Sequence, residues 1–327
     1  MKHFSPDLLK LDYDRTVQTI VGAIRKALRN DLKRKGLVVA VSGGIDSSTV
    51  AALCVEAVGK ERVFNLLLPE QDSSPETYRL SRMIPQHLGT EYIEENITPI
   101  LEAFGCYRRR DEAIRQVVPQ FGPDWKSKIV LPDLKDSNTL RLFSVIAESP
   151  DGRVIKERLT PQAYLGIVAA TNFKQRTRKT LEYYHADRLN YAATGTPNRL
   201  EYDQGFFVKG GDGLADIKPI AHLYKTQVYA LARHLELPDE ICSRLPTTDT
   251  YSMPQSQEEF YFSLPYDKMD LCLYGLNNGY TPDQVAPSVE LTPKQVQWVY
   301  DDIRQKRQTT RYLHLKAQLI EPINEIE

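Results

Sequence analysis

The sequence lacks any excess of charge of one sign. Its 42 Lys and Arg residues nearly balance its 43 Asp and Glu residues, so composition gives no argument for a nucleic-acid or membrane-surface partner. Long apolar runs are also missing, since none approaches the roughly 20 residues that a membrane-spanning helix needs. The charged N-terminus has no apolar segment of the kind found in signal peptides. We therefore expect a soluble, cytoplasmic protein that binds neither nucleic acid nor membrane.

Cysteine and histidine are scarce and scattered. The four cysteines form no Cys-x-x-Cys pair, and neither they nor the six histidines cluster at the spacing of zinc ligands. This pattern predicts reduced, buried thiols rather than a disulfide framework or a structural zinc site. No Ser-His-Asp arrangement is apparent, and no other enzyme nucleophile is evident. The cysteines are Cys54, Cys106, Cys242 and Cys272.

Short apolar runs alternate with amphipathic segments over the first hundred residues. Alternation of this kind predicts an α/β fold, in which helices flank a Rossmann-like parallel sheet. The predicted strands are residues 37–41, 62–70 and 90–97, and the predicted helices are residues 11–35, 46–59 and 74–89.

Several helix ends carry capping signals. Ser74, followed by a proline, is the expected N-cap of the helix at 74–89, and Ser73 is the alternative because Glu76 follows it at capping-box spacing. Thr160, also followed by a proline, is the expected N-cap of a helix in the second half of the chain. Gly59 is the expected C-cap of the helix at 46–59.

Residues 105–160 are dense in proline, glycine and charge and also contain several aromatic residues. The turn sequence Ser-Pro-Asp-Gly at 149–152 predicts a β-hairpin. We interpret the region as an insertion that covers one edge of the sheet. The alternative is that it covers the site or a subunit interface. This alternative arises because the insertion follows a strand, and parallel sheets bind ligands at the carboxyl ends of their strands. The run Arg108–Arg110 has two interpretations. Its side chains are either exposed to solvent at the surface, or one of them contacts a phosphate of the substrate.

The second half returns to helical patterns and one further strand. A helix is predicted from residue 161, a strand at 191–195, a helix at 225–237 before Pro238, and a last helix at 291–308. We expect residues 280–327 to form a C-terminal helical segment and residues 1–327 to form one domain.

The stretch Ser-Gly-Gly-Ile-Asp-Ser-Ser at 42–48 lies between a predicted buried strand and a predicted helix. Adjacent glycines can take positive φ and turn backbone N–H groups toward one point, at which the helix also directs its positive end. This arrangement predicts an anion site. Asp46 would repel a bare phosphate, so its presence predicts a divalent cation between carboxylate and phosphate. The stretch is neither a Walker A loop nor the Gly-x-Gly-x-x-Gly of a dinucleotide fold.

This loop resembles the pyrophosphate-binding loop of the ATP pyrophosphatases, which activate a carboxylate or carbonyl oxygen as an adenylate. Among them, the second half of the chain resembles the ammonia-dependent NAD synthetases. The matching segments are "NFKQRTR" at 172–178, the long stretch from Gly195 to Val228, "LPTTDTY" at 245–251 and "SQEEFYFSLPYDKMD" at 256–270. The resemblance implies a fold like that of the adenine nucleotide alpha hydrolases. It also implies the conversion of nicotinic acid adenine dinucleotide, ATP and ammonia into NAD, AMP and pyrophosphate.

The resemblance also implies roles for individual residues. Asp46, Asp212 and Lys225 would be catalytic, with Asp212 near the nicotinate and the incoming ammonia. Asp46 and Glu201 would hold Mg²⁺. The deamidated dinucleotide would contact Asn172, Arg176, Lys209 and Asp216. ATP would contact Ser42, Gly43, Gly44, Ile45, Asp46, Ser47, Ser48, Thr196, Lys225 and Thr247.

Two features depart from the resembling enzymes. Residues 105–160 are longer than the corresponding connection in compact ammonia-dependent enzymes, and Arg311 stands where a substrate-contacting lysine is expected. An NAD-synthetase-like ligase for another carboxylate and a non-catalytic adenine nucleotide sensor therefore stay as alternatives. The resemblance further implies a homodimer, with helices near 11–30 and 160–185 at its interface. The ammonia would be free or supplied by a separate amidase.

Overall fold

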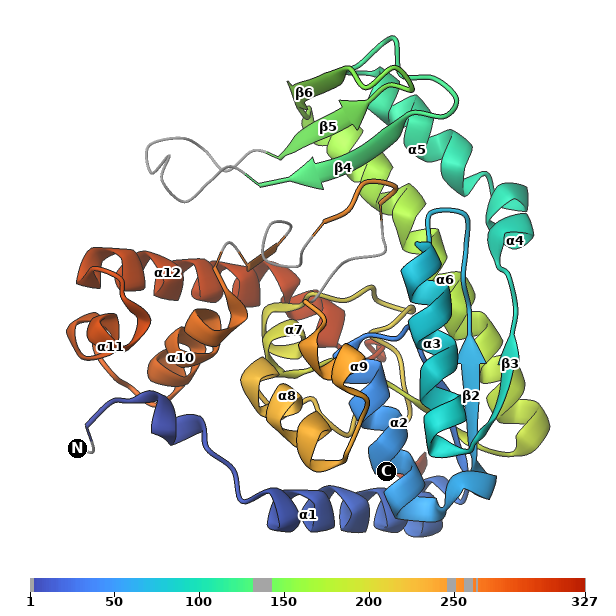
Figure 1. Cartoon of the computed structure of the whole chain (residues 1–327), viewed down its shortest axis with the longest axis vertical. Helices are drawn as coiled ribbons and strands as arrows, with labels where there is room; N and C mark the ends of the chain where they lie inside the picture. The colour runs from blue at the N-terminus through green and yellow to red at the C-terminus, as the bar shows by residue number, and fades with distance from the viewer. Residues whose placement is uncertain (1–2, 132–142, 246–250, 256–260, 263, 327) are drawn as a thin grey trace.

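The computed structural model describes residues 3–131, 143–245, 251–255, 261–262 and 264–326. At its centre lies a parallel sheet of four strands in the order β3-β2-β1-β7 (Figure 1). Leu37 of β1 lies opposite Val63 of β2 on one side and opposite Ala192 of β7 on the other. The predicted α/β fold with a parallel sheet is therefore confirmed. The strands are β1 (Leu37–Ala40), β2 (Val63–Leu67), β3 (Glu91–Glu94) and β7 (Ala192–Thr194).

Helices cover both faces of this sheet. Leu37 and Val39 pack on one face and Val38 on the other, and all three are fully buried, as expected of a strand in a parallel sheet. The first face carries α1 (Tyr13–Lys26), α2 (Ile45–Val58), α3 (Pro75–Leu88) and α8 (Lys225–His234). The second face carries α4 (Thr98–Ala103), α5 (Cys106–Arg115) and the long helix α6 (Pro161–Leu189).

The capping signals are confirmed. Ser74 Oγ accepts a hydrogen bond from Thr77 N at 3.1 Å, so Ser74 is the N-cap of α3. The alternative, Ser73, instead accepts from Glu70 N. Thr160 Oγ1 caps α6 in the same way, and Gly59 ends α2 with φ 83°.

The inserted region contains α5 and a separate antiparallel sheet. This sheet consists of β4 (Lys126–Val130), β5 (Ser144–Glu148) and β6 (Val154–Arg158), and the predicted hairpin joins its last two strands. The small sheet lies beyond the N-terminal end of α6, above the parallel strands and away from the edge strand β3 (Figure 1). The expectation that the insertion covers an edge of the parallel sheet is therefore wrong.

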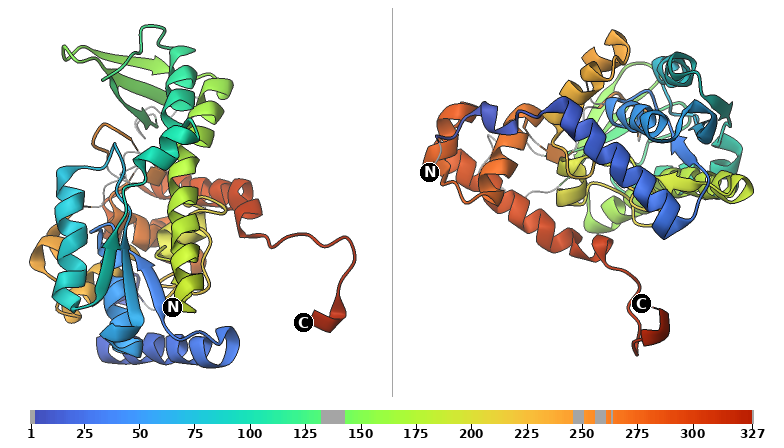
Figure 2. Two further views of the ribbon diagram at one scale, coloured as in Figure 1. Left: turned by 90° about the vertical axis from the view of Figure 1, so that its right-hand side faces the viewer. Right: turned by 90° about the horizontal axis from the view of Figure 1, so that it is seen from below.

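The C-terminal helices form a second apolar core beside the sheet. It includes Phe4 near the N-terminus together with α10 (Tyr266–Asn277), α11 (Pro282–Val289) and α12 (Pro293–Thr310). After a 3₁₀ turn at Arg311–His314, the chain leaves the body without forming another α-helix (Figure 2). The predicted helical segment 280–327 is thus helical mainly in its first part. None of the described helices is long and apolar enough to cross a membrane.

Candidate active site

A cavity of about 740 Å³ opens at the carboxyl ends of β1 and β7. The chain continues from β1 to β2 on one side, whereas β7 pairs with β1 on the other, so the cavity lies at the point where the strand order reverses. Open parallel sheets bind their ligands at such a point. The walls come from the loop after β1, from α6, from the segment 194–212 and from the end of α12.

The Ser-Gly-Gly loop forms the cavity floor through its own hydrogen bonds. Ser47 Oγ accepts from Ser42 N at 3.3 Å and donates to Gly44 O at 3.1 Å, while Ser48 Oγ donates to Gly44 O at 2.8 Å. Only Gly43 has positive φ, at 74°, whereas Gly44 is extended and is the N-cap of α2. The expectation that both glycines take positive φ therefore applies to one of them.

We expect Gly43→Ala to weaken ATP binding and to destabilise the fold, because a Cβ at Gly43 would lie 2.6 Å from Leu80 Cβ and 2.8 Å from Leu80 backbone carbon. Positive φ adds strain for any residue with a side chain. Gly44→Ala is the matched control, since its nearest contact is Ser42 Oγ at 3.3 Å. The measurements are ATP affinity and urea unfolding, and equal effects of the two substitutions would contradict this account.

Asp46 and Lys225 form an ion pair at the edge of this floor. Lys225 begins α8 and is 2% exposed. Burial alone would lower its pKa, but the Asp46 and Glu201 carboxylates outweigh burial and hold the pKa of Lys225 above its usual value. Asp270, whose pKa burial raises to about 7, accepts hydrogen bonds from Lys225 N and Thr226 N and so fixes the start of α8.

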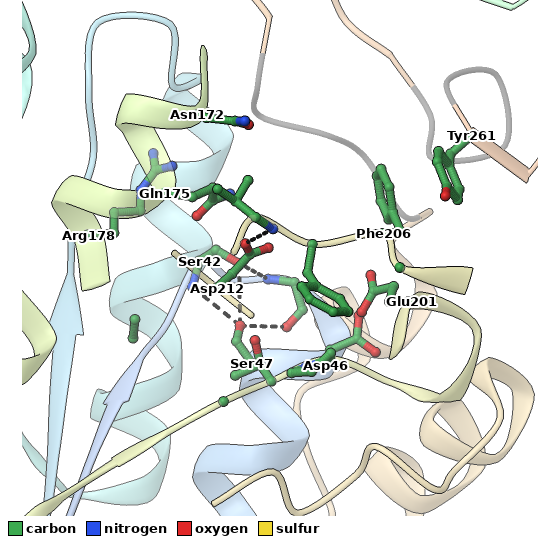
Figure 3. A pocket seen from close by; sticks show the side chains of 18 of the residues that line it. Ser42, Asp46, Ser47, Asn172, Gln175, Arg178, Glu201, Phe206, Asp212 and Tyr261 are labelled. Atoms are coloured by element: carbon green, nitrogen blue, oxygen red, sulfur yellow. Dashed lines mark hydrogen bonds between the residues drawn. The ribbon is translucent and has the colours of Figure 1, made fainter. Parts of the chain in front are cut away.

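Asn198, which sequence reasoning missed, connects the two carboxylates predicted to hold a cation. Its side-chain amide donates to Asp46 Oδ1 at 3.0 Å, and its backbone N donates to Glu201 Oε2 at 3.1 Å. Asn198 also caps α7 (Arg199–Gln204) in a capping box with Glu201. An Asn followed by Glu three residues later was the available sequence signal. Figure 3 shows Asp46 and Glu201 close together, with Asn172, Gln175 and Arg178 projecting from α6 on the opposite wall.

These donors suit a cation that arrives with a phosphate. Among the described residues, no group of three or more His, Cys, Asp or Glu side chains could hold a metal ion alone. Mg²⁺ is commonly bound by one or two carboxylates together with substrate phosphates. Asp46 and Glu201 match that donor set.

The cavity lining includes most of the predicted ligand-binding residues. The exceptions among the described residues are Gly43, Ser48 and Asp216. Thr247 lies outside the described residues. Arg311 instead lines a neighbouring hollow with Arg199 and Arg307. Those that line the cavity are Ser42, Gly44, Ile45, Asp46, Ser47, Asn172, Arg176, Thr196, Glu201, Lys209, Asp212 and Lys225.

The predicted substrate residues differ in their surroundings. Arg176 Nε donates to Lys209 O at 3.2 Å, and Lys209 Nζ donates to Tyr312 O at 2.8 Å, so α6 and the C-terminal turn meet at this wall. Asp216 instead accepts hydrogen bonds from Ala193 N and Tyr183 Oη, which ties it to β7 and α6. Asp216 is thus held by β7 and α6, and it is absent from the cavity lining.

The arginine triplet does not reach the cavity. Arg110 is 5% exposed and pairs with Asp72 and Asp111. Arg108 pairs with Glu112 at the surface, and Arg109 donates to Phe104 O. None of the three lines the cavity, so the expectation that one reaches a substrate phosphate there is wrong.

The family model described as NAD synthase matches residues 16–118 and 145–312. This chain belongs to the NAD synthase family. It is 57% identical over 324 residues to an "NH(3)-dependent NAD(+) synthetase" of Rhizobium meliloti, covering 99% of this chain and 97% of that protein. A protein of the same name in Mesorhizobium japonicum is 56% identical over 97% of this chain and its own whole length.

Solved structures of NAD synthases share the fold. The NH3-dependent NAD synthetase from Campylobacter jejuni matches with a TM-score of 0.62 at 23% identity, over 95% of this chain and 100% of that one. The NAD synthase model leaves residues 119–144 unmatched, within the inserted region. The alignment with the Rhizobium meliloti protein nevertheless covers almost the whole chain. The insertion is therefore compatible with close relationship to proteins of that name.

Proposed function

We propose that this enzyme amidates nicotinic acid adenine dinucleotide with ATP and ammonia, giving NAD, AMP and pyrophosphate. The proposal rests on one observation: the same cavity is lined by the Ser-Gly-Gly loop, the Asp46–Lys225 ion pair and Glu201. The near full-length similarity to proteins named NH3-dependent NAD synthetases supports the same reaction. Because such relatives share nearly the whole length of the chain, the insertion gives no argument for another carboxylate.

The chemistry explains the residue types. A carboxylate acylates poorly, so it is first adenylated by attack on the α-phosphate of ATP, which gathers negative charge at the phosphates. The N–H groups of the loop and of the α2 N-terminus bind the phosphates, and Lys225 places a buried positive charge beside them. Mg²⁺, held by Asp46 and Glu201 when bound with ATP, would neutralise further charge. Arg176, Lys209 and Asn172 would orient the dinucleotide along α6.

We propose free ammonia as the nitrogen donor and a homodimer as the assembly. Ile20, Val21 and Ile24 of α1 are buried within the chain's own core, so α1 has little apolar surface left for a partner. On α6, Leu165 and Tyr184 are both more than half exposed. The proposed C2 surface therefore lies on α6 rather than α1, and light scattering of the active enzyme tests it.

The test is an assay of purified protein with ATP, Mg²⁺ and ammonium. Nicotinic acid adenine dinucleotide is compared with a panel of other carboxylates, while AMP and pyrophosphate are followed. We expect the dinucleotide to give the highest kcat/KM, with one AMP and one pyrophosphate per amide formed. A higher kcat/KM with another carboxylate, or release of ADP and phosphate, would overturn the proposal.

A further inference from the structure

One end of the cavity is aromatic, and the inserted region forms part of it. Phe143, which immediately precedes β5, stacks on Tyr164 of α6 with ring centroids 4.4 Å apart and an interplanar angle of 16°. Both side chains are half-buried and both line the cavity. Leu131, which follows β4, lines the cavity as well. The insertion therefore contributes two apolar side chains to the cavity wall.

The aromatic end is fixed by hydrogen bonds between the small sheet and the described segment 251–255. Ser127 N, on β4, donates to Ser252 Oγ at 2.9 Å, and Met253 N donates to Ser127 O at 3.3 Å. Tyr251, which is 4% exposed, lines the cavity and belongs to the apolar cluster against which the two stacked rings pack. The small sheet is therefore joined to the cavity wall on two sides, by α6 and by this segment.

One face of α6 connects the aromatic end to the Gly-Asp-Gly turn. A Cβ at Gly211 would lie 2.9 Å from Gln175 Cβ, so the turn packs against α6 at Gln175. Because each helical residue rises about 1.5 Å, Tyr164 lies about 16 Å from this contact along the helix. Between and beyond these points, a row of lining residues recurs at intervals of three or four: Tyr164, Val168, Thr171, Gln175, Lys179 and Glu182.

The aromatic end suits a planar base, because purine rings stack favourably on aromatic side chains. Two substrates of the proposed reaction carry adenine. In ATP, one ribose separates the adenine from the reacting α-phosphate. In the deamidated dinucleotide, two riboses and a diphosphate separate the adenine from the reacting carboxylate. Since the aromatic end lies about 16 Å along α6 from the turn expected near the nicotinate, the longer of the two substrates fits this separation better.

We propose that Phe143 and Tyr164 bind the adenine ring of the deamidated dinucleotide, an inference that rests on the proposed function. The NAD synthase model leaves residues 119–144 unmatched, so Phe143 and Leu131 come from a part of the chain that the model does not describe. The insertion thereby makes the enzyme selective for the complete dinucleotide over a nicotinate nucleotide without the adenosine half.

Phe143→Leu tests the proposal, because it keeps an apolar side chain and removes the ring. We expect the KM for the dinucleotide to rise about 10-fold, the effect of losing one base–aromatic stack. The KM for ATP should change little. Nicotinic acid mononucleotide, which lacks the adenosine half, should give the same kcat/KM with the variant as with the wild type. Phe143→Tyr keeps a ring and should behave like the wild type with both substrates.

Two further variants separate base binding from packing. Tyr164→Leu removes the other ring without changing the insertion and should show the same selective loss. Trp125→Leu is the matched control, because Trp125 packs in the same apolar cluster, 5.6 Å from the Phe121 ring, but does not line the cavity. Its KM for the dinucleotide should stay at the wild-type value.

Three results would overturn the adenine site. They are a wild-type KM for the dinucleotide in folded Phe143→Leu, an increase in the KM for ATP instead, and an equal loss in Trp125→Leu. A wild-type enzyme that forms no AMP with the dinucleotide would overturn the proposed function, and this inference with it.

Discussion

Asp46→Asn is expected to lower AMP formation by about 10²–10³-fold, the usual effect of removing one preorganised group that stabilises transition-state charge. Asp46 carries a charge that binds both Lys225 and, when ATP is present, the proposed cation. An amide at this position can still accept the hydrogen bond from Asn198, so the local loop geometry should persist. The assay is AMP release with saturating substrates, and normal turnover in a folded Asp46→Asn variant would exclude the assigned role.

This substitution should also affect stability, because Lys225 is buried. A buried ammonium without its carboxylate destabilises a fold by about 3–5 kcal/mol. The variant Asp46→Asn with Lys225→Met removes both charges and should recover most of the free energy of unfolding while staying inactive. Comparing the two variants separates loss of catalysis from loss of fold.

The local features of this fold could be predicted because their causes are local. Ser74 and Thr160 were identifiable as N-caps from neighbouring prolines, and the strand β1 from its short apolar run. The phosphate-side residues Asp46 and Lys225 were found through ordered motifs, although the ion pair between them was not. Asp46 and Lys225 are far apart in the sequence, so their pairing depends on the tertiary fold, which no local pattern specifies.

Buried charge is where sequence reasoning failed. Arg110 sits in a run of three arginines that is typical of a solvated surface or a phosphate site, yet only its neighbours are exposed. Its partner Asp72 follows β2, and the other cation on that carboxylate, Lys174, comes from α6. Lys179 and Glu182, a buried ion pair of α6, were also missed, because their burial depends on the tertiary fold.

The buried network around Arg110 joins the insertion to the site. Lys174 Nζ lies 2.9 Å from Glu70 Oε1 and 2.6 Å from Asp72 Oδ2. Tyr107 Oη donates to Glu70 Oε2 at 2.7 Å, and Arg110 Nη1 lies 2.8 Å from Asp72 Oδ2. The network thus holds α5 of the insertion against α6 and against the loop after β2. Removal of residues 107–155 should therefore disrupt the fold and would not isolate a lid.

Arg110→Met is expected to reduce the free energy of unfolding by about 3–5 kcal/mol, because it leaves buried acidic groups with one cation fewer. Arg108→Met is the matched control from the same run of arginines, since its side chain is 63% exposed and pairs with Glu112 one turn away. Surface pairs of this kind contribute about 0.2–1 kcal/mol. Urea unfolding midpoints of the two variants decide the matter. If the two substitutions shifted the midpoint equally, Arg110 would not be the buried link between the insertion and the cavity wall.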